Sequence, residues 1–161
     1  MTNKQVGIDF LKIIVIYGVY WTLIYLAATY NVPGSLGVIY HSPNGQVANE
    51  ETFTEPLLLW AQVVMGTSLL CCLMWYVLGE WGLKPYKTQH GTWVLIWWVL
   101  LVVVLLTGIL AALMGPQATE NGWVLAMFYL LGGAGFYYIA TIFCSPVNTK
   151  YVVSGSRTLR R

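Results

Sequence analysis

The fold is decided by residues 92–114, TWVLIWWVLLVVVLLTGILAALM, a run that contains no charged residue. A helix that crosses a bilayer needs about 20 mostly apolar residues. Working outward from this run, the segments 13–30, 56–78 and 122–143 meet the same requirement. The sequence therefore predicts an all-α integral membrane protein, a four-transmembrane-helix bundle that forms a single membrane domain over residues 1–161.

The composition indicates the same class of protein. Hydrophobic residues make up 58% of the 161 residues and charged residues 9%, with a mean hydropathy of +0.66. A soluble domain has about 25% charged residues, so 8 Lys+Arg and 6 Asp+Glu are too few to cover a surface that faces water. These numbers exclude a soluble enzyme, a disordered tail and a nucleic-acid binder.

The positions of the basic residues predict the orientation. They lie before the first apolar segment, between the second and third, and after the fourth: Lys4, Lys12, Lys84, Lys87, Lys150, Arg157, Arg160 and Arg161. Because Lys and Arg collect in the cytoplasmic segments of membrane proteins, both termini are expected to be cytoplasmic and the loop 31–55 to lie outside. The small size and the lack of a sorting signal favour a bacterial inner membrane.

The outer loop carries most of the polar features. Residues 37–47, GVIYHSPNGQV, have the pattern of strand, turn and strand, which favours a short β-hairpin within the loop 31–55. An outer metal site is a second hypothesis for this region, because imidazole and carboxylate ligands suit several divalent ions. Its candidate ligands are His41, Glu50, Glu51 and Glu55. The commoner alternative is a surface histidine without a ligand.

Residues that carry chemistry are scarce inside the apolar segments. No acidic or basic residue lies in the middle of a segment, and Asp9 and Lys12 at the edge of the first are expected to pair. Cys71, Cys72 and Cys144 would suit a soft metal if their thiolates converged, but buried cysteine is more often a small hydrophobic residue. No Walker A, G-x-S-x-G or H-E-x-x-H motif occurs, so no catalytic residue is assigned.

Small residues mark faces where helices can approach one another closely. Gly108 and Ala112 have the four-residue spacing of helix-packing faces. Gly132, Gly133 and Gly135 give the fourth segment little side-chain bulk. Close helix packing is the preferred interpretation, and a bend or a slot for a lipid or a cofactor tail are the alternatives. On the second segment, the side chains of Gln62 and Thr67 offer hydrogen bonds between helices.

Aromatic residues make up 15% of the chain, and some lie deep in the apolar segments. Tyr17, Trp21 and Tyr25 recur every four residues on one face of the first segment. Buried Tyr and Trp need partners for their O–H and N–H groups, so this face is expected to meet protein. The alternative is an aromatic groove for a quinone or a pigment. No cofactor is assigned, with bound lipid or quinone as the open alternatives.

Three functions fit this pattern. The preferred hypothesis is a structural or accessory subunit of a larger membrane complex, such as a membrane oxidoreductase or a secretion or transport assembly. Its partners would be other membrane subunits and lipid, in a homo- or hetero-oligomer. One alternative is a membrane redox-enzyme subunit whose outer metal site is completed by a partner chain. The other is a self-assembling neutral pore lined by the hydroxyl groups of Thr22, Thr29, Thr67, Ser68 and Thr107.

Overall fold

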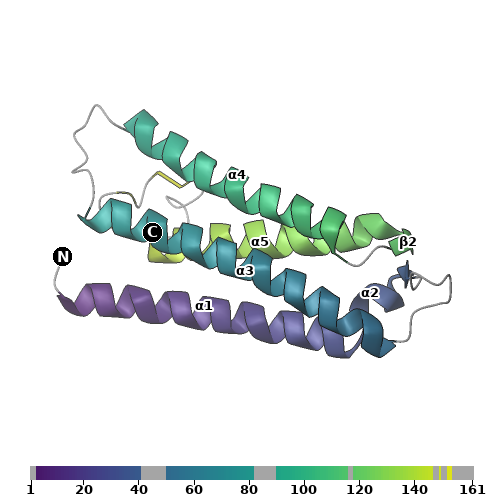
Figure 1. Cartoon of the computed structure of the whole chain (residues 1–161). Helices are drawn as coiled ribbons and strands as arrows, with labels where there is room; N and C mark the ends of the chain where they lie inside the picture. Colours follow the sequence, from purple (N-terminus) through teal and green to yellow (C-terminus); the bar gives the residue numbers. More distant parts are fainter. Residues whose placement is uncertain are drawn as a thin grey trace.

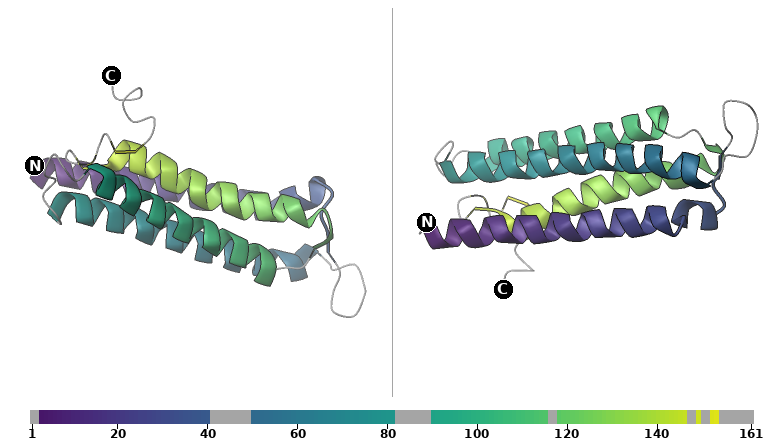
Figure 2. Two further views of the ribbon diagram at one scale, coloured as in Figure 1. Left: turned by 90° about the horizontal axis from the view of Figure 1, so that it is seen from above. Right: turned by 60° about the horizontal axis from the view of Figure 1, so that its bottom comes forward.

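The computed structural model describes residues 3–40, 50–81, 90–115, 118–146, 149, 152 and 153. Along the chain the elements are α1 (Asn3–Thr29), α2 (Val32–Ser35), β1 (Ile39–Tyr40), α3 (Glu50–Trp81), α4 (His90–Met114), β2 (Ala118–Glu120) and α5 (Gly122–Cys144). The long helices α1, α3, α4 and α5 lie side by side and alternate in direction (Figures 1 and 2).

The two ends of the described bundle differ in the elements that they carry. α1 begins and α5 ends at one end, which we call the terminal end (Figure 1). The opposite end carries α2, β1 and β2, and we call it the sheet end. This arrangement follows from an even number of long helices that alternate in direction.

Four helices are long and apolar enough to cross a membrane: Gln5–Thr29, Thr54–Trp81, Gly91–Met114 and Gly122–Cys144. This confirms the predicted all-helical, multi-pass membrane class. The bounds of α4 and α5 lie within two residues of the predicted segments 92–114 and 122–143. α1 and α3 begin earlier than the predicted positions 13 and 56, at Asn3 and Glu50.

The early start of α1 has a visible cause in its polar side chains. The Lys12 ammonium lies 3.1 Å from a carboxylate oxygen of Asp9, so the expected pair is present within the helix. Asp9 is 3% exposed and also accepts hydrogen bonds from Gln5 and from Tyr76 of α3. Because these contacts satisfy the carboxylate of Asp9, α1 can include residues 3–12, which precede the apolar segment predicted from hydropathy.

Glycine and proline end the last two helices. α4 stops at Met114, before Gly115. α5 stops at Cys144, and the following Ser145 is extended, with φ −64° and ψ 136°. This is the conformation that a residue before proline prefers, and Pro146 follows it. α3 instead continues through Pro56, which was predicted to lie at its first position.

The sheet end joins two loops that are distant in the sequence. β1 pairs antiparallel with β2, with Ile39 opposite Glu120 and an irregularity before Tyr40. The Asn121 side chain donates a hydrogen bond of 2.9 Å to the Gly37 carbonyl beside this pairing. The described strand of the long loop therefore pairs with the α4–α5 connection. The turn of the predicted hairpin, at 42–45, lies outside the described residues, and the hairpin stays a prediction.

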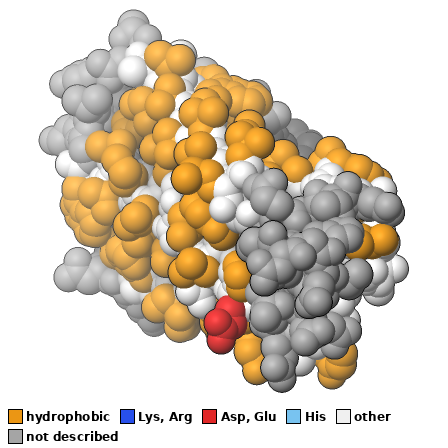
Figure 3. Space-filling model, turned by 45° about the vertical axis from the view of Figure 1, so that its right-hand side comes forward, with side chains coloured by type: hydrophobic (Ala, Val, Ile, Leu, Met, Phe, Trp, Pro, Cys, Tyr) orange, Lys and Arg blue, Asp and Glu red, His pale blue; other side chains and the backbone are white. Residues whose placement is uncertain are grey.

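The interior is unusually aromatic for a chain of this size. α3 and α5 pack against each other and against both α1 and α4. The largest fully buried side chains include Trp75, Tyr76, Tyr129 and Tyr137. The outer surface is apolar as well, and on the face shown in Figure 3 the coloured side chains are mostly hydrophobic. An apolar exterior around a polar-aromatic interior is what a bilayer-embedded bundle requires.

Candidate functional site: an apolar groove and an exposed amide on the bundle surface

The predicted metal ligands lie mainly outside the described part of the chain. His41 is among the residues that the structure does not describe. Glu50 and Glu51 begin α3, and their side chains are also outside the description, whereas Glu55 is an exposed residue near the sheet end. In the described ranges, no group of three His, Cys, Asp or Glu side chains could hold a metal ion. The outer metal site stays a prediction.

The cysteines are buried in the bundle as free thiols. Cys71 and Cys72 lie on α3 and Cys144 ends α5. They do not form a metal-binding group with other described side chains. Their burial is what is usual for cysteine as a small hydrophobic residue, and the soft-metal alternative stays a prediction.

Two of the predicted small residues, Gly108 and Gly133, lie where helices pack closely. A methyl group built on Gly108 would lie 3.1 Å from the Leu130 side chain, so α4 meets α5 closely there. One built on Gly133 would lie 2.6 Å from Val64 of α3. Both glycines therefore serve helix packing, and Ala112 packs against the core on the same helix as Gly108.

Gly135 differs from its neighbours, because nothing lies within 4 Å of a methyl group built there. Gly132 borders the side chain of Tyr20, whose hydroxyl would lie 2.7 Å from an added methyl group. The glycine run on α5 thus packs on one side and leaves space on another.

The hydroxyl groups proposed to line a pore do not converge. The Thr22, Thr29, Thr67 and Thr107 hydroxyls each donate to a carbonyl four residues earlier in their own helix. Ser68 is buried in the bundle, whereas the other four hydroxyls bond their own helices on exposed sides. Within one copy of the chain, these five side chains form no common lining.

Buried hydroxyls instead tie α5 to the other helices. Ser68 donates to the Gly133 carbonyl at 2.9 Å and lies 2.8 Å from the Tyr17 hydroxyl. Because Ser68 has a single hydroxyl proton, Tyr17 is the donor in the second bond. α1 is thereby linked through α3 to the backbone of α5.

Two further hydroxyls repeat this arrangement toward the terminal end. Thr141 accepts from the Trp97 indole of α4 at 3.1 Å and donates to a carbonyl of α5. Ser145 accepts from the Trp75 indole of α3 at 2.9 Å and donates to the Thr141 carbonyl. These polar groups satisfy one another inside the bundle, so they serve structure and leave no open catalytic group.

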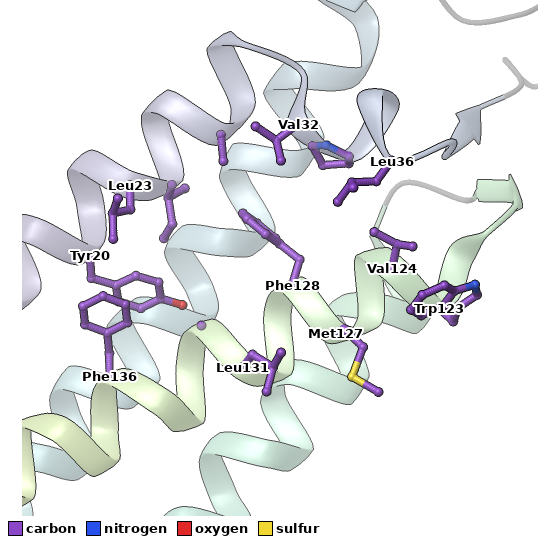
Figure 4. Close-up of a pocket in the computed structure, with 14 residues that line it drawn as sticks. Tyr20, Leu23, Val32, Leu36, Trp123, Val124, Met127, Phe128, Leu131 and Phe136 are labelled. Carbon is purple, nitrogen blue, oxygen red and sulfur yellow. The ribbon is translucent and has the colours of Figure 1, made fainter.

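A groove opens on the bundle surface between α1, α2 and α5 (Figure 4). Its volume is about 680 Å³, within the range of small-molecule sites. Its lining is apolar or aromatic throughout: Tyr20, Leu23, Ile24, Ala27, Val32, Pro33, Leu36, Trp123, Val124, Met127, Phe128, Leu131, Gly132 and Phe136. The groove runs from α2 at the sheet end toward the middle of the bundle.

Tyr20 lies at the deep end of this groove. Its ring stacks on Phe136, with ring centroids 4.2 Å apart and an interplanar angle of 7°. The side chain is 4% exposed, and its hydroxyl makes no hydrogen bond to any described residue. The other buried tyrosines all have a partner: Tyr17 with Ser68, Tyr76 with Asp9, Tyr129 with Leu57 and Tyr137 with Trp97.

A second unsatisfied polar group lies on the outside of α3. Gln62 is exposed, and its amide makes no hydrogen bond to a residue in the described part of the chain. Gly66 is one turn further along, with nothing within 4 Å of a methyl group built on it. The side chains of Leu59, Val63 and Leu70 around them are apolar and exposed. We call Gln62 and Gly66 with these three residues the α3 face.

Sequence reasoning missed Tyr20 and misplaced part of the aromatic face of α1. Tyr17 is buried, but Tyr25 is 53% exposed, so the four-residue spacing of Tyr17, Trp21 and Tyr25 does not follow the contact. The contact follows a mixed spacing of three and four residues: Ile13, Tyr17, Tyr20, Ile24 and Ala28. That spacing is the usual signal of a helix-packing face and would have identified Tyr20.

Comparison of the chain with protein-family models, with curated proteins and with solved structures found no match to any of them.

Proposed function

We propose that this protein is an accessory subunit of a larger membrane complex, which it joins through the α3 face. The single observation that supports this proposal is the amide of Gln62, which has no hydrogen-bond partner among the described residues and lies on an otherwise apolar, exposed surface. Gln62 lies about 8 Å from the middle of the span Thr54–Trp81, at 1.5 Å per residue. This depth is inside a hydrocarbon core of about 30 Å.

An amide at this depth favours contact with another helix over contact with lipid. Acyl chains offer no hydrogen-bond partner, and side-chain hydrogen bonds between transmembrane helices contribute about 1 kcal/mol each. Gly66 lies on the same face and lets a second backbone approach closely. The occupant that fits is a transmembrane helix with a polar side chain opposite Gln62 and a small residue opposite Gly66.

We also propose an orientation and a membrane for this subunit. The terminal end would be cytoplasmic, because in the sequence all eight Lys and Arg residues lie in the first part of α1, between α3 and α4, or after α5. The membrane would be a bacterial inner membrane. Labelling of single cysteines introduced at Leu36 and at Trp81 with a membrane-impermeant maleimide tests this orientation. Only the first should react from outside the cell.

Site-specific photo-crosslinking in cells tests the accessory role. A photoreactive amino acid at position 62 or 66 is expected to crosslink to a different membrane protein. The matched control is position 110 on α4, where Leu110 is similarly exposed but surrounded by aliphatic side chains. It should crosslink mainly to lipid.

Two substitutions sharpen the experiment. Gln62→Leu and Gly66→Leu should reduce recovery of the partner in mild detergent, with Leu110→Ala as the control. Crosslinks from positions 62 and 66 to a second copy of this chain would contradict the accessory role and indicate a homo-oligomer. Crosslinks to lipid alone would contradict any docking at the α3 face.

A further inference from the structure

We infer that the groove between α1, α2 and α5 binds a neutral prenylated quinone, with one ring carbonyl accepting a hydrogen bond from the Tyr20 hydroxyl. The inference stands on residues of α1, α2 and α5, and so does not depend on the partner proposed for α3. It concerns binding alone and involves no chemical step.

The hydroxyl of Tyr20 defines the polar requirement of the ligand. It is a buried donor with no acceptor among the described residues, and such a group is costly when it is left unpaired. Every other buried tyrosine in the described ranges has an acceptor or a hydroxyl partner. Its position beside Gly132, at the deep end of the groove, makes a bound molecule the source of its acceptor (Figure 4).

The depth of Tyr20 distinguishes a quinone from a phospholipid. Tyr20 lies about 5 Å from the middle of the span Gln5–Thr29. The polar groups of a phospholipid begin about 15 Å from the bilayer centre, so its acyl chain would reach Tyr20 with no acceptor. A quinone has no charged headgroup, and its carbonyl can lie at this depth.

The walls of the groove suit the rest of such a molecule. The rim contains exposed apolar side chains, with Leu131 at 69% and Leu23 at 51% exposure, so the groove is accessible from the bilayer. Phe128 of α5 and Pro33 of α2 offer flat apolar surfaces along its length. The ring would lie near Tyr20, and the isoprenoid chain would follow the groove toward α2.

Binding of a defined probe to the purified full-length chain in nanodiscs tests the inference. The probe is a p-benzoquinone that carries two isoprene units, and the readout is quenching of tryptophan fluorescence, since Trp123 lines the groove. The comparison compound carries the same isoprenoid chain on a benzene ring without carbonyls. Infrared spectra of the bound quinone report the hydrogen bond, because its C=O stretch shifts to lower frequency when the oxygen accepts one.

Three variants separate the contributions of the groove and of the hydroxyl. Tyr20→Phe keeps the ring stacked on Phe136 and should weaken quinone binding about 3- to 10-fold, the range expected for one hydrogen bond. It should also abolish the infrared shift. Tyr25→Phe, on the exposed side of the same helix, should change neither quantity. Ala27→Phe fills the groove and should abolish saturable binding while thermal unfolding stays as in the wild type.

The expected result is saturable binding with one site per chain, tighter for the quinone than for its carbonyl-free analogue. Equal binding of the two compounds, or an unchanged affinity and infrared spectrum in Tyr20→Phe, would overturn the inference and indicate an acyl-chain groove. Absence of saturable binding by the wild type would also overturn it.

Discussion

Replacing Gly133 with alanine inserts a methyl group at the point where α5 meets both α3 and α4. The new carbon would lie 2.6 Å from a methyl group of Val64 and 3.1 Å from one of Val104. Ordinary contacts between carbons are 3.5–4.0 Å, so a valine side chain or one of the helices must shift. The same residue's carbonyl accepts the Ser68 hydrogen bond, which a shift would also strain.

The expected loss can be worked from opposing terms. Overpacking costs about 1–3 kcal/mol, whereas alanine in place of glycine favours a helix by about 1 kcal/mol. The net free energy of unfolding should therefore fall by up to about 2 kcal/mol. Gly135→Ala is the matched control, because its methyl group meets nothing within 4 Å. That variant should be neutral, or more stable by up to about 1 kcal/mol.

The assay is reversible unfolding of both variants in mixed micelles, with increasing mole fraction of a denaturing detergent. The account requires Gly133→Ala to unfold at a lower mole fraction than the wild type and Gly135→Ala at an equal or higher one. Equal midpoints for the two variants would refute the assignment of Gly133 to helix packing.

Two further predictions concern the buried hydroxyls and the sheet end. Ser68→Ala leaves the Tyr17 hydroxyl without its partner and removes the hydrogen bond from α3 to the Gly133 carbonyl, and it should cost about 1–3 kcal/mol in the same unfolding assay. Thr67→Ala, whose hydroxyl bonds its own helix, should change the midpoint little, and equal losses would contradict this reading. Gly37→Ala places a side chain at φ +82°, which costs about 1–2 kcal/mol. It should speed amide exchange at the sheet end, including Asn121, while exchange in the middle of α3 stays unchanged.

The sequence was sufficient to predict the helices whose stability depends on apolar length. α4 and α5 are uninterrupted apolar runs that end at Gly115 and at Ser145-Pro146, so both hydropathy and turn chemistry mark their bounds. α1 begins earlier than its apolar run because Asp9 is satisfied by Lys12 and by contacts with α3. The sequence pattern around Asp9 does not show that Tyr76, 67 residues later, will donate a hydrogen bond to its carboxylate.

The candidate site depends even more on contacts between helices, which the sequence does not reveal. The glycine run on α5 raised a packing surface, a bend and a slot as alternatives; Gly133 packs against α3 and α4, and Gly132 lines the groove, whose occupant stays a prediction. The outcome depends on which residues of other helices lie opposite, and α2, which closes one end of the groove, was not predicted. Likewise, Gln62 was predicted to offer a hydrogen bond between helices, and its exposed position on the outer side of α3 could not be read from the sequence.

Native mass spectrometry of the complex, released from mild detergent, tests the accessory role most directly, because it reports partners and copy number together. The account predicts a species that contains this chain and at least one different membrane subunit, and loss of that subunit in Gln62→Leu. A wild-type spectrum that contains only this chain, as a monomer or as a homo-oligomer, would contradict it.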